Sequence, residues 1–518
     1  MNSQEILRFC LKNGLLVDKE LLNLFSETND TDSIKLIINR LKSQTNQKII
    51  TRNVIINNRD EIKKIFSDLP EENQKNLESL KIKLGLSIEI SKEVSSESAI
   101  DIEKNKPSDV RIVSMAPSVS KKLEVADFVK YFKGRISKMS YFLQERAELG
   151  NVVSINKISG TRQGFSIIGI VSDKRITKNK NMILELEDLT GKIKVLINQN
   201  KPELYEKAEE ISLDSVIGVK GTGSREILFA NDVIFPDSSL PERKKGNKDE
   251  YALFIGDLHI GSKLFMESNF IKFIDYLNGK VPYALETGKI KYLFVVGDLI
   301  AGVGIYPGQE NELVIPDIEE QYAKAAELLS KIRSDIKIII CPGNHDSVRI
   351  MEPQPVLDEK YAWPLYNLKN VILVGNPVTI NIGTNENFSG FDVLMYHGYS
   401  IHYYSNNITR LMKEKAVHNP DKIAHYLLKN RHLAPTHSST LYFPSEKDHF
   451  IIEKIPDIFL LGHSHKSAIS YYNNILVISS SSWESKTAFQ EKMGNEPDFC
   501  KVPMFNLKTR SVKVLDFE

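Results

Sequence analysis

Aspartate, asparagine and histidine residues follow a series of short apolar segments in the second half of the chain. All eleven histidines lie after residue 258, so this chemistry is confined to one part of the sequence. Carboxylate and amide oxygens suit Mn²⁺ or Mg²⁺, and imidazoles suit Zn²⁺, Fe²⁺ and Mn²⁺. These residue types therefore indicate a pair of divalent ions. The candidates are Asp257, His259, Asp298, Asn344, His345, His397, His463 and His465.

The spacing of these residues supports a shared site. Asp257 and His259, like His463 and His465, are two positions apart, which puts both side chains on one side of an extended segment. Glycines beside the candidates allow tight turns and close backbone approach. A single histidine in such a place is usually a hydrogen-bonded core residue. That explanation would have to hold at five separate points, so a joint functional role is favoured.

The apolar segments are predicted to be strands of a layered α/β domain over residues 250–518. Each is a continuous apolar run, as expected for strands buried on both faces, and a helix is predicted over 318–332. Open α/β sheets place their sites at the carboxyl ends of strands, so these ends can converge on one crevice. The predicted strands are 251–255, 292–296, 336–340, 393–396, 458–461 and 475–478.

Four segments precede this domain. Residues 1–90 read as a small helical docking domain, in which Asp32 and Ser33 can cap a helix that carries Ile34, Ile37, Ile38 and Leu41 on one face. Residues 91–122 are rich in Ser, Lys, Glu and Pro and are predicted to be a flexible linker. Residues 237–249 form a second polar linker.

Residues 123–236 are predicted to be a helix followed by an OB-fold barrel. The helix carries apolar residues at helical spacing, from Val125 to Leu143, and four β-rich runs follow, separated by turns. Lys174, Arg175, Lys178 and Lys180 could follow a single-stranded phosphate backbone or could be a solvated loop. OB barrels also bind proteins, so the fold leaves the role of this domain open, and DNA-binding residues stay unknown.

Composition limits the function classes. The chain has 518 residues, and 68 basic and 67 acidic side chains give a net charge of +1, which excludes a uniformly basic nucleic-acid coat. Cys10, Cys341 and Cys500 are too few and too far apart for a disulfide framework, so a reducing, cytoplasmic setting fits best. The first residues lack the pattern of a signal peptide. No apolar run is long enough for a membrane span.

Over residues 250–510 the ordered motifs resemble the calcineurin-like metallophosphoesterase superfamily. They are Asp257-Leu258-His259, Gly297-Asp298, Gly343-Asn344-His345-Asp346, His397 and Gly462-His463-Ser464-His465. The resemblance implies one metal held by Asp257, His259, Asp298 and His465. It implies a second held by Asp298, Asn344, His397 and His463, with His345 as general acid. The two ions would be Mn²⁺ or Mg²⁺, with Zn²⁺ and Fe²⁺ as alternatives.

One position departs from the superfamily. In the superfamily the aspartate at the position of Asp298 is a ligand of both metals. Many members carry a second aspartate three residues later, which orients the acid histidine. This chain has Ala301 at that position. Such a carboxylate normally fixes the imidazole tautomer. The sequence therefore predicts a functional metal site with weakened acid catalysis.

A narrower resemblance rests on segments that metal binding does not require. They are 302–309, 344–349, 352–355, 431–435 and 482–485. Together with the domain order they resemble the small-subunit family of archaeal DNA polymerase D, also called DNA polymerase II. This resemblance implies a heterodimer with a large polymerising subunit, contact with DNA 3′ ends and with other replication proteins, and 3′→5′ exonuclease proofreading.

Two alternatives stay open. The chain could be a non-catalytic assembly subunit with a vestigial site, or a phosphatase of small phosphoesters, against which the long N-terminal half argues. His402, His425, His432 and His437 lie outside the motifs and are expected to be surface or packing residues. Trp483 is expected in the core, and Arg349 could meet a phosphate or form a structural ion pair.

Overall fold

The computed structural model describes residues 3–18, 22, 25, 34–35, 38–39, 49–50, 110–118 and 121–518. The chain forms two compact units, residues 1–104 and 105–518. Among the described helices, none has the length and apolar character needed to cross a bilayer.

The first unit contains helix α1 (Ser3–Lys12) and two short parallel strands, β1 (Leu16–Val17) and β2 (Ile49–Ile50). Ile34 and Ile38, from the predicted capped helix, are helical and buried. Asp32, Ser33, Ile37 and Leu41 lie outside the described residues, as does most of the predicted docking domain.

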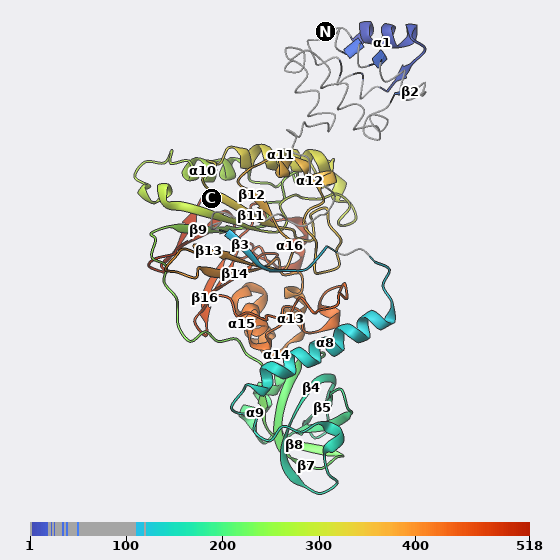
Figure 1. Cartoon of the computed structure of the whole chain (residues 1–518), viewed down its shortest axis with the longest axis vertical. Coiled ribbons are helices and arrows are strands. Elements are labelled where there is room, and N and C mark those ends of the chain that lie inside the picture. Colours follow the sequence, from blue (N-terminus) through green and yellow to red (C-terminus); the bar gives the residue numbers. More distant parts are fainter. Residues whose placement is uncertain are drawn as a thin grey trace. The chain divides into compact units, whose positions relative to one another are not determined.

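A closed five-stranded barrel occupies the first part of the second unit (Figure 1). Alternate residues of β5 and β6 are buried, so the period-two pattern of these segments fills the barrel interior. Helix α9 (Pro202–Glu209) follows the third strand, and the order β4-β5-β6-β8-β7 is that of the predicted OB fold. The strands are β4 (Gln163–Ile176), β5 (Met182–Glu187), β6 (Lys192–Ile197), β7 (Val216–Gly223) and β8 (Ile227–Ile234), preceded by the short helix η1 (Ile155–Lys157).

Two six-stranded sheets form the centre of the C-terminal domain. The first has the order β12 (Val371–Leu373), β11 (Lys337–Cys341), β10 (Ile290–Val296), β9 (Tyr251–Ile255), β18 (Lys501–Asn506) and β19 (Val512–Asp516). The second has the order β16 (Ala468–Tyr472), β17 (Ile475–Ser479), β15 (Ile458–Leu461), β14 (Phe391–Tyr396), β13 (Val378–Ile382) and β3 (Val110–Met115).

Helices cover the outer face of each sheet (Figure 1). Along β9, Leu253 and Ile255 pack toward the helices, whereas Ala252 and Phe254 pack between the sheets. This alternation explains why the strands read as continuous apolar runs, since both of their faces are buried. The first sheet carries α10 (Glu267–Leu277), α11 (Ile318–Ser330) and α12 (Glu359–Tyr366), and the second carries α13 (Ile401–Asn407), α14 (Thr409–Lys413) and α15 (Pro420–Asn430).

Shorter elements lie in the connecting loops. They are η2 (Leu285–Lys289), η3 (Gln309–Glu312), η4 (Ala416–His418), η5 (His437–Ser439) and α16 (Ala488–Met493).

The structure corrects part of the predicted linker 91–122. Residues 110–115 form β3, an edge strand that pairs antiparallel with β13. Its partner residues lie more than 250 positions further along the chain, so no local signal marks the pairing. The second predicted linker, 237–249, has no helix or strand and is held to the C-terminal domain, for example by Lys244 Nζ at 2.7 Å from Asp457 Oδ2.

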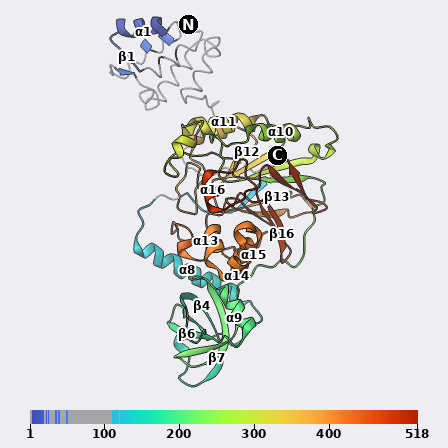
Figure 2. The same cartoon turned by 180° about the vertical axis from the view of Figure 1, so that it is seen from behind.

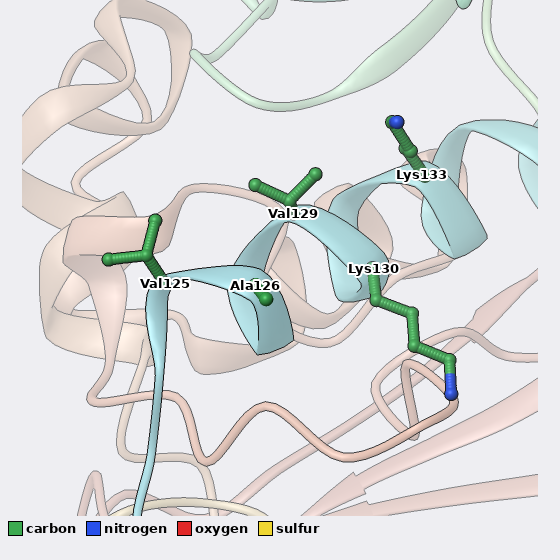
Figure 3. Close-up of a pocket in the computed structure, with 5 residues that line it drawn as sticks. All are labelled: Val125, Ala126, Val129, Lys130 and Lys133. Atoms are coloured by element: carbon green, nitrogen blue, oxygen red, sulfur yellow. The ribbon is translucent and has the colours of Figure 1, made fainter.

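Helix α8 (Val125–Gln144) lies between the barrel and helices α13–α15 in both views (Figures 1 and 2). Its second half buries Ile136, Met139 and Leu143, as the spacing predicts. Val125 and Val129 were part of the same predicted face but are 81% and 47% exposed. They help to line a shallow pocket on the first turns of the helix (Figure 3).

Candidate metal centre

All eight predicted site residues lie together at the carboxyl ends of five strands. Strands β9, β10 and β11 run parallel in the first sheet, and β14 and β15 run parallel in the second. The loop after each of these strands carries the candidates. The prediction of one shared crevice therefore agrees with the positions of these strand ends.

Asp298 lies at the centre of the group. Its Oδ2 atom is 3.3 Å from His397 Nε2, 3.8 Å from His259 Nε2 and 4.0 Å from His345 Nε2. Asp298 is only 1% exposed, so these contacts are made away from solvent. One carboxylate thus faces imidazoles from three other strand ends, those of β9, β11 and β14.

Donor atoms gather on both sides of Asp298. On one side, His465 Nε2 is 3.1 Å from His259 Nε2 and 3.6 Å from Asp257 Oδ1. On the other side, Asp298, His397 and His463 offer ligand atoms that all lie within 4.8 Å of one another. Asn344 Oδ1 joins this second side at 3.0 Å from His397 Nε2.

The donor set fits two divalent cations. Asp257 and Asp298 are buried, and no lysine or arginine among the described residues forms an ion pair with either carboxylate. Buried carboxylates need a compensating charge, and mixed oxygen and imidazole donors suit borderline divalent ions. Asp298 belongs to a candidate group on each side and would be a ligand shared by the two ions.

The pKa shifts favour the neutral imidazole at three of the four candidate histidine ligands. At His397 burial lowers the pKa, but the Asp298 carboxylate outweighs burial and raises the pKa to about 10. Burial lowers the pKa of His259 and His463 well below the usual range and that of His465 to about 3, so these imidazoles are neutral with a free lone pair. Burial also opposes ionisation of Asp298, but His397 and other imidazoles bring the pKa of this carboxyl well below its usual range. Burial raises the pKa of Asp257. An adjacent cation would reverse that shift.

Most of the candidate ligands adopt left-handed backbone conformations. The φ angles are 51° at Asp257, 50° at His259, 48° at Asp298, 63° at His463 and 53° at His465. Non-glycine residues in this region are uncommon and strained, and such strain gathers at functional sites. Five of them at one crevice indicate that the loops are shaped for the side chains they present.

Two glycines let the loops approach closely. A Cβ added at Gly343 would overlap the Asp298 carboxylate, and one added at Gly297, where φ is 83°, would overlap the His397 imidazole. The glycines that flank the motifs are therefore required by the packing of the site itself.

His345 is oriented by the backbone at the position where the superfamily aspartate is missing. Its Nδ1 atom is 2.8 Å from the carbonyl oxygen of Ala301, which can only accept, so Nδ1 carries the proton. The Nε2 atom then faces Asp298. The imidazole tautomer is thus fixed without a carboxylate, which was not predicted from the sequence.

A second set of buried polar groups holds the loops that carry the candidates. The Asp346 carboxylate accepts backbone N–H groups of Gly343, Leu299 and Ile300 at 2.8 to 3.3 Å. It thereby ties the loop after β11 to the loop after β10.

The Glu-Pro-Gln-Pro segment has a similar role. Gln354 Nε2 donates to Gly343 O at 3.0 Å, and Asn376 Oδ1 accepts His397 N at 2.9 Å. Asn376 Nδ2 donates to Gln354 Oε1 and to Glu352 Oε1, which links both supports. The residue types at 352–355 are therefore explained by these hydrogen bonds, which hold the backbone next to Asn344 and at His397.

A cavity of about 470 Å³ opens beside His345. Its lining includes His259, Asp298, His463 and His465 together with apolar side chains of Tyr306, Pro307 and Leu313. Ligand sites usually combine a largely apolar lining with a few polar groups.

The cavity also contains residues that were not predicted from the sequence. His402 was expected to be a surface or packing residue, but it lines the cavity and its ring lies 5.0 Å from that of His463. Glu484 lines the cavity as well, and burial raises its pKa to about 7. His402 has no motif beside it in the sequence. Glu484 belongs to the segment 482–485, which supported the narrower resemblance but was given no site role.

His425, His432, His437 and Trp483 make packing contacts, as predicted. His432 is buried and bonded to Asp448, His425 lies 2.9 Å from Ser470 Oγ, and His437 packs on Tyr442. Trp483 is fully buried. Arg349 donates to the Pro353 carbonyl and lies over the Phe443 ring.

One of the basic barrel residues has a structural role. Lys174 Nζ donates to the carbonyl oxygens of Ala208, Glu209 and Ile211 at 2.7 to 3.2 Å, so it caps the end of α9. The prediction of a loop is wrong for Lys174 and Arg175, because both belong to β4, and Lys174 is not free for phosphate or solvent. Arg175, Lys178 and Lys180 are exposed, and DNA contact stays a prediction for them.

Comparisons with known proteins match both folded parts of the second unit. Residues 253–470 match the family of the B subunits of DNA polymerases alpha and epsilon. Residues 165–226 match the family described as OB-fold nucleic acid binding domain.

Several archaeal relatives are similar over most of the chain. The DNA polymerase II small subunit of Methanothermobacter thermautotrophicus is 38% identical over 76% of this chain and 80% of its own length. The protein of the same name from Pyrococcus furiosus is 38% identical over 79% of this chain and 68% of its own length. That from Thermoplasma acidophilum is 33% identical over 78% of this chain and 80% of its own length.

Proposed function

This chain belongs to the family of DNA polymerase II small subunits, and we propose that it is a metal-dependent 3′→5′ DNA exonuclease that proofreads for a replicative polymerase. Its partner would be the large polymerising subunit of a heterodimer, and its substrate would be DNA 3′ ends. The observation that carries the proposal is the gathering of six other candidate metal ligands around the Asp298 carboxylate.

Each candidate ligand has a place in a two-ion site. Asp257, His259, Asp298 and His465 would hold one ion. Asp298, Asn344, His397 and His463 would hold the second, with Mn²⁺ or Mg²⁺ as the first candidates. When bound, such a pair lowers the pKa of an attacking water and stabilises the charge that develops during in-line displacement at phosphorus.

His345 has the position expected of the general acid. Its Nδ1–H donates to the Ala301 carbonyl, and its Nε2 faces the cavity side near Asp298. A protonated His345 can therefore give its Nε2 proton to the leaving 3′ oxygen of the shortened strand and keep the Nδ1 proton throughout. The Ala301 bond holds the ring for that transfer.

The cavity supports a nucleotide-sized substrate group. Its lining combines charged and polar donors with Tyr306, Pro307 and Leu313, whose apolar surface suits a base. The OB barrel, of a type that often binds single strands, lies in the same unit.

Exonuclease assay of the purified chain tests the proposal. The substrate is a 5′-labelled DNA oligonucleotide with Mn²⁺, and the variants are Asp298→Ala and His345→Ala. We expect each to lose at least about 100-fold in rate, because ligand loss and general-acid loss each have effects of that order. His418→Ala, at an exposed histidine outside the site, is the matched control and should be unchanged.

Equal activity in all variants would refute the catalytic proposal and leave an assembly subunit. A strong preference for a simple phosphomonoester over the DNA 3′ end would instead indicate a phosphatase. The proposed heterodimer is tested by co-expression with a large polymerising subunit and co-purification of the two chains.

A further inference from the structure

The carbonyl oxygen of Ala301 accepts two side-chain donors. One is His345 Nδ1 at 2.8 Å, and the other is Gln309 Nε2, also at 2.8 Å. The Ala301 N–H donates to Ile260 O at 2.9 Å, so the residue is fixed by both of its polar backbone groups. The group that orients His345 is itself held in place.

The orientation of the Gln309 amide is not free. Gln309 is 2% exposed, and its Oε1 atom accepts the backbone N–H of Ile305 at 2.9 Å. Because that contact needs an oxygen, the NH₂ group must face Ala301 O. Gln309 therefore clamps both ends of the turn 301–305.

A second buried glutamine fixes the same loop from the helix behind it. Gln321 on α11 is fully buried; its Oε1 accepts Gly302 N at 2.9 Å, and its Nε2 donates to Ile315 O at 2.7 Å. The loop after Ala301 is thus held by Gln309, which belongs to the loop itself, and by Gln321, which lies on α11. Metal binding does not require the residues of segment 302–309. These hydrogen bonds give a physical reason for their types, because they fix the loop.

We propose that Gln309 is a positioning residue for the acid step, because it holds the Ala301 carbonyl where that carbonyl fixes the His345 ring. The inference rests on the proposed phosphodiesterase function. The clamp does the work of the aspartate that many superfamily members carry at position 301. Acid catalysis is accordingly not weakened by Ala301, in contrast to the expectation from sequence.

This role predicts a loss that depends on the leaving group. Protonation matters for a poor leaving group such as the 3′ alkoxide of DNA, and matters little for p-nitrophenolate. The Gln309 amide bonds to the backbone of Ile305 and Ala301 and to no candidate ligand, so ion binding should not depend on it.

The experiment compares two substrates with the full chain and Mn²⁺. One is a 5′-labelled DNA oligonucleotide, and the other is the p-nitrophenyl ester of thymidine 5′-phosphate. Gln309→Met removes both amide contacts at nearly constant length, whereas Gln309→Glu keeps an acceptor for Ile305 N and replaces the NH₂ donor to Ala301 O with a carboxylate oxygen. We expect kcat on DNA to fall by about 10- to 100-fold in each variant, a part of the usual general-acid effect.

Three further measurements distinguish a loss of His345 positioning from general damage to the site. KM for DNA, bound Mn²⁺ and kcat on the p-nitrophenyl ester should each change less than about threefold. Adding Ala301→Asp to Gln309→Met should restore most of the kcat on DNA, because a carboxylate can then orient His345 directly.

Two results would overturn the inference. One is an equal loss on both substrates, and the other is an unchanged kcat on DNA in Gln309→Glu and Gln309→Met. A wild-type chain that cleaves neither substrate would refute the proposed function itself, which is a different outcome.

Discussion

A buried ion pair should decide how firmly helix α8 is docked. The Asp448 carboxylate is fully buried and accepts four hydrogen bonds, from Arg135 Nε at 2.6 Å, Tyr131 OH at 2.6 Å, His432 Nε2 at 2.9 Å and Phe450 N at 3.1 Å. Arg135 and Tyr131 lie on α8, whereas Asp448 and His432 belong to the C-terminal domain. Asp448→Asn removes the charge and keeps the shape.

The loss of stability in Asp448→Asn comes from the Arg135 charge, which stays buried without its partner. Arg135 is 1% exposed, and without the Asp448 charge its remaining partners are neutral. They are the carbonyl oxygens of Pro435 and Asp214 and the rings of Tyr131, Phe132 and Tyr442. Breaking a buried pair by removing one partner costs about 3–5 kcal/mol, because the other charge stays buried. That is about 10²- to 10⁴-fold in an opening equilibrium.

Hydrogen exchange of α8 measures this directly, since local opening exposes its backbone amides. We expect the slowest α8 amides of Asp448→Asn to exchange faster by that factor. The double variant Arg135→Met/Asp448→Asn also lacks the buried Arg135 charge. Its α8 amides should exchange at least about tenfold more slowly than those of Asp448→Asn alone. Lys130→Gln breaks an exposed pair with Glu446 on the same helix and should leave exchange nearly unchanged. Unchanged exchange in Asp448→Asn would refute the reasoning.

Three further predictions concern other buried polar groups. Asp346→Ala leaves three backbone N–H groups without an acceptor, so Mn²⁺ affinity should fall by about 10- to 100-fold, and unchanged affinity in a calorimetric titration would contradict this. Burial raises the pKa of Glu352 to about 7, above its unfolded value of about 4.3, so the stability that this carboxyl contributes is full below about pH 4 and is lost as pH rises through 7. The melting temperature of the metal-free wild type should therefore fall more between pH 5 and pH 8 than that of Glu352→Gln, and parallel curves would be contrary to this. Lys174→Met should destabilise the barrel by about 1–3 kcal/mol in denaturant titration without changing single-stranded DNA affinity; a weaker affinity in a stable variant would restore the phosphate role.

Strand ends and their polar residues were predictable because the signal is local. Asp298 and Asn344 each follow a buried apolar run within three residues, and parallel strands bring such ends to one edge. The barrel was predictable for the same reason, since alternation of apolar residues lies within each strand.

The rest depends on contacts that sequence does not mark. Strand β3 pairs with β13 across more than 250 residues, and its neighbours in sequence have linker composition. His402 enters the cavity only because the loop after β14 lies against the loop after β15. The Ala301 carbonyl orients His345 through a backbone atom, and a backbone atom leaves no trace in the residue type.

Metal stoichiometry tests the central claim most directly. Mn²⁺ titration of the metal-free chain, with electron paramagnetic resonance of the loaded protein, should give about two ions per chain and the spectrum of a coupled pair, as expected for ions that share one carboxylate. Asp298→Asn should lose the coupling and most of the affinity, whereas His418→Ala should keep both. A wild-type chain that binds no Mn²⁺ at these residues, or binds it equally well after Asp298→Asn, would contradict the account.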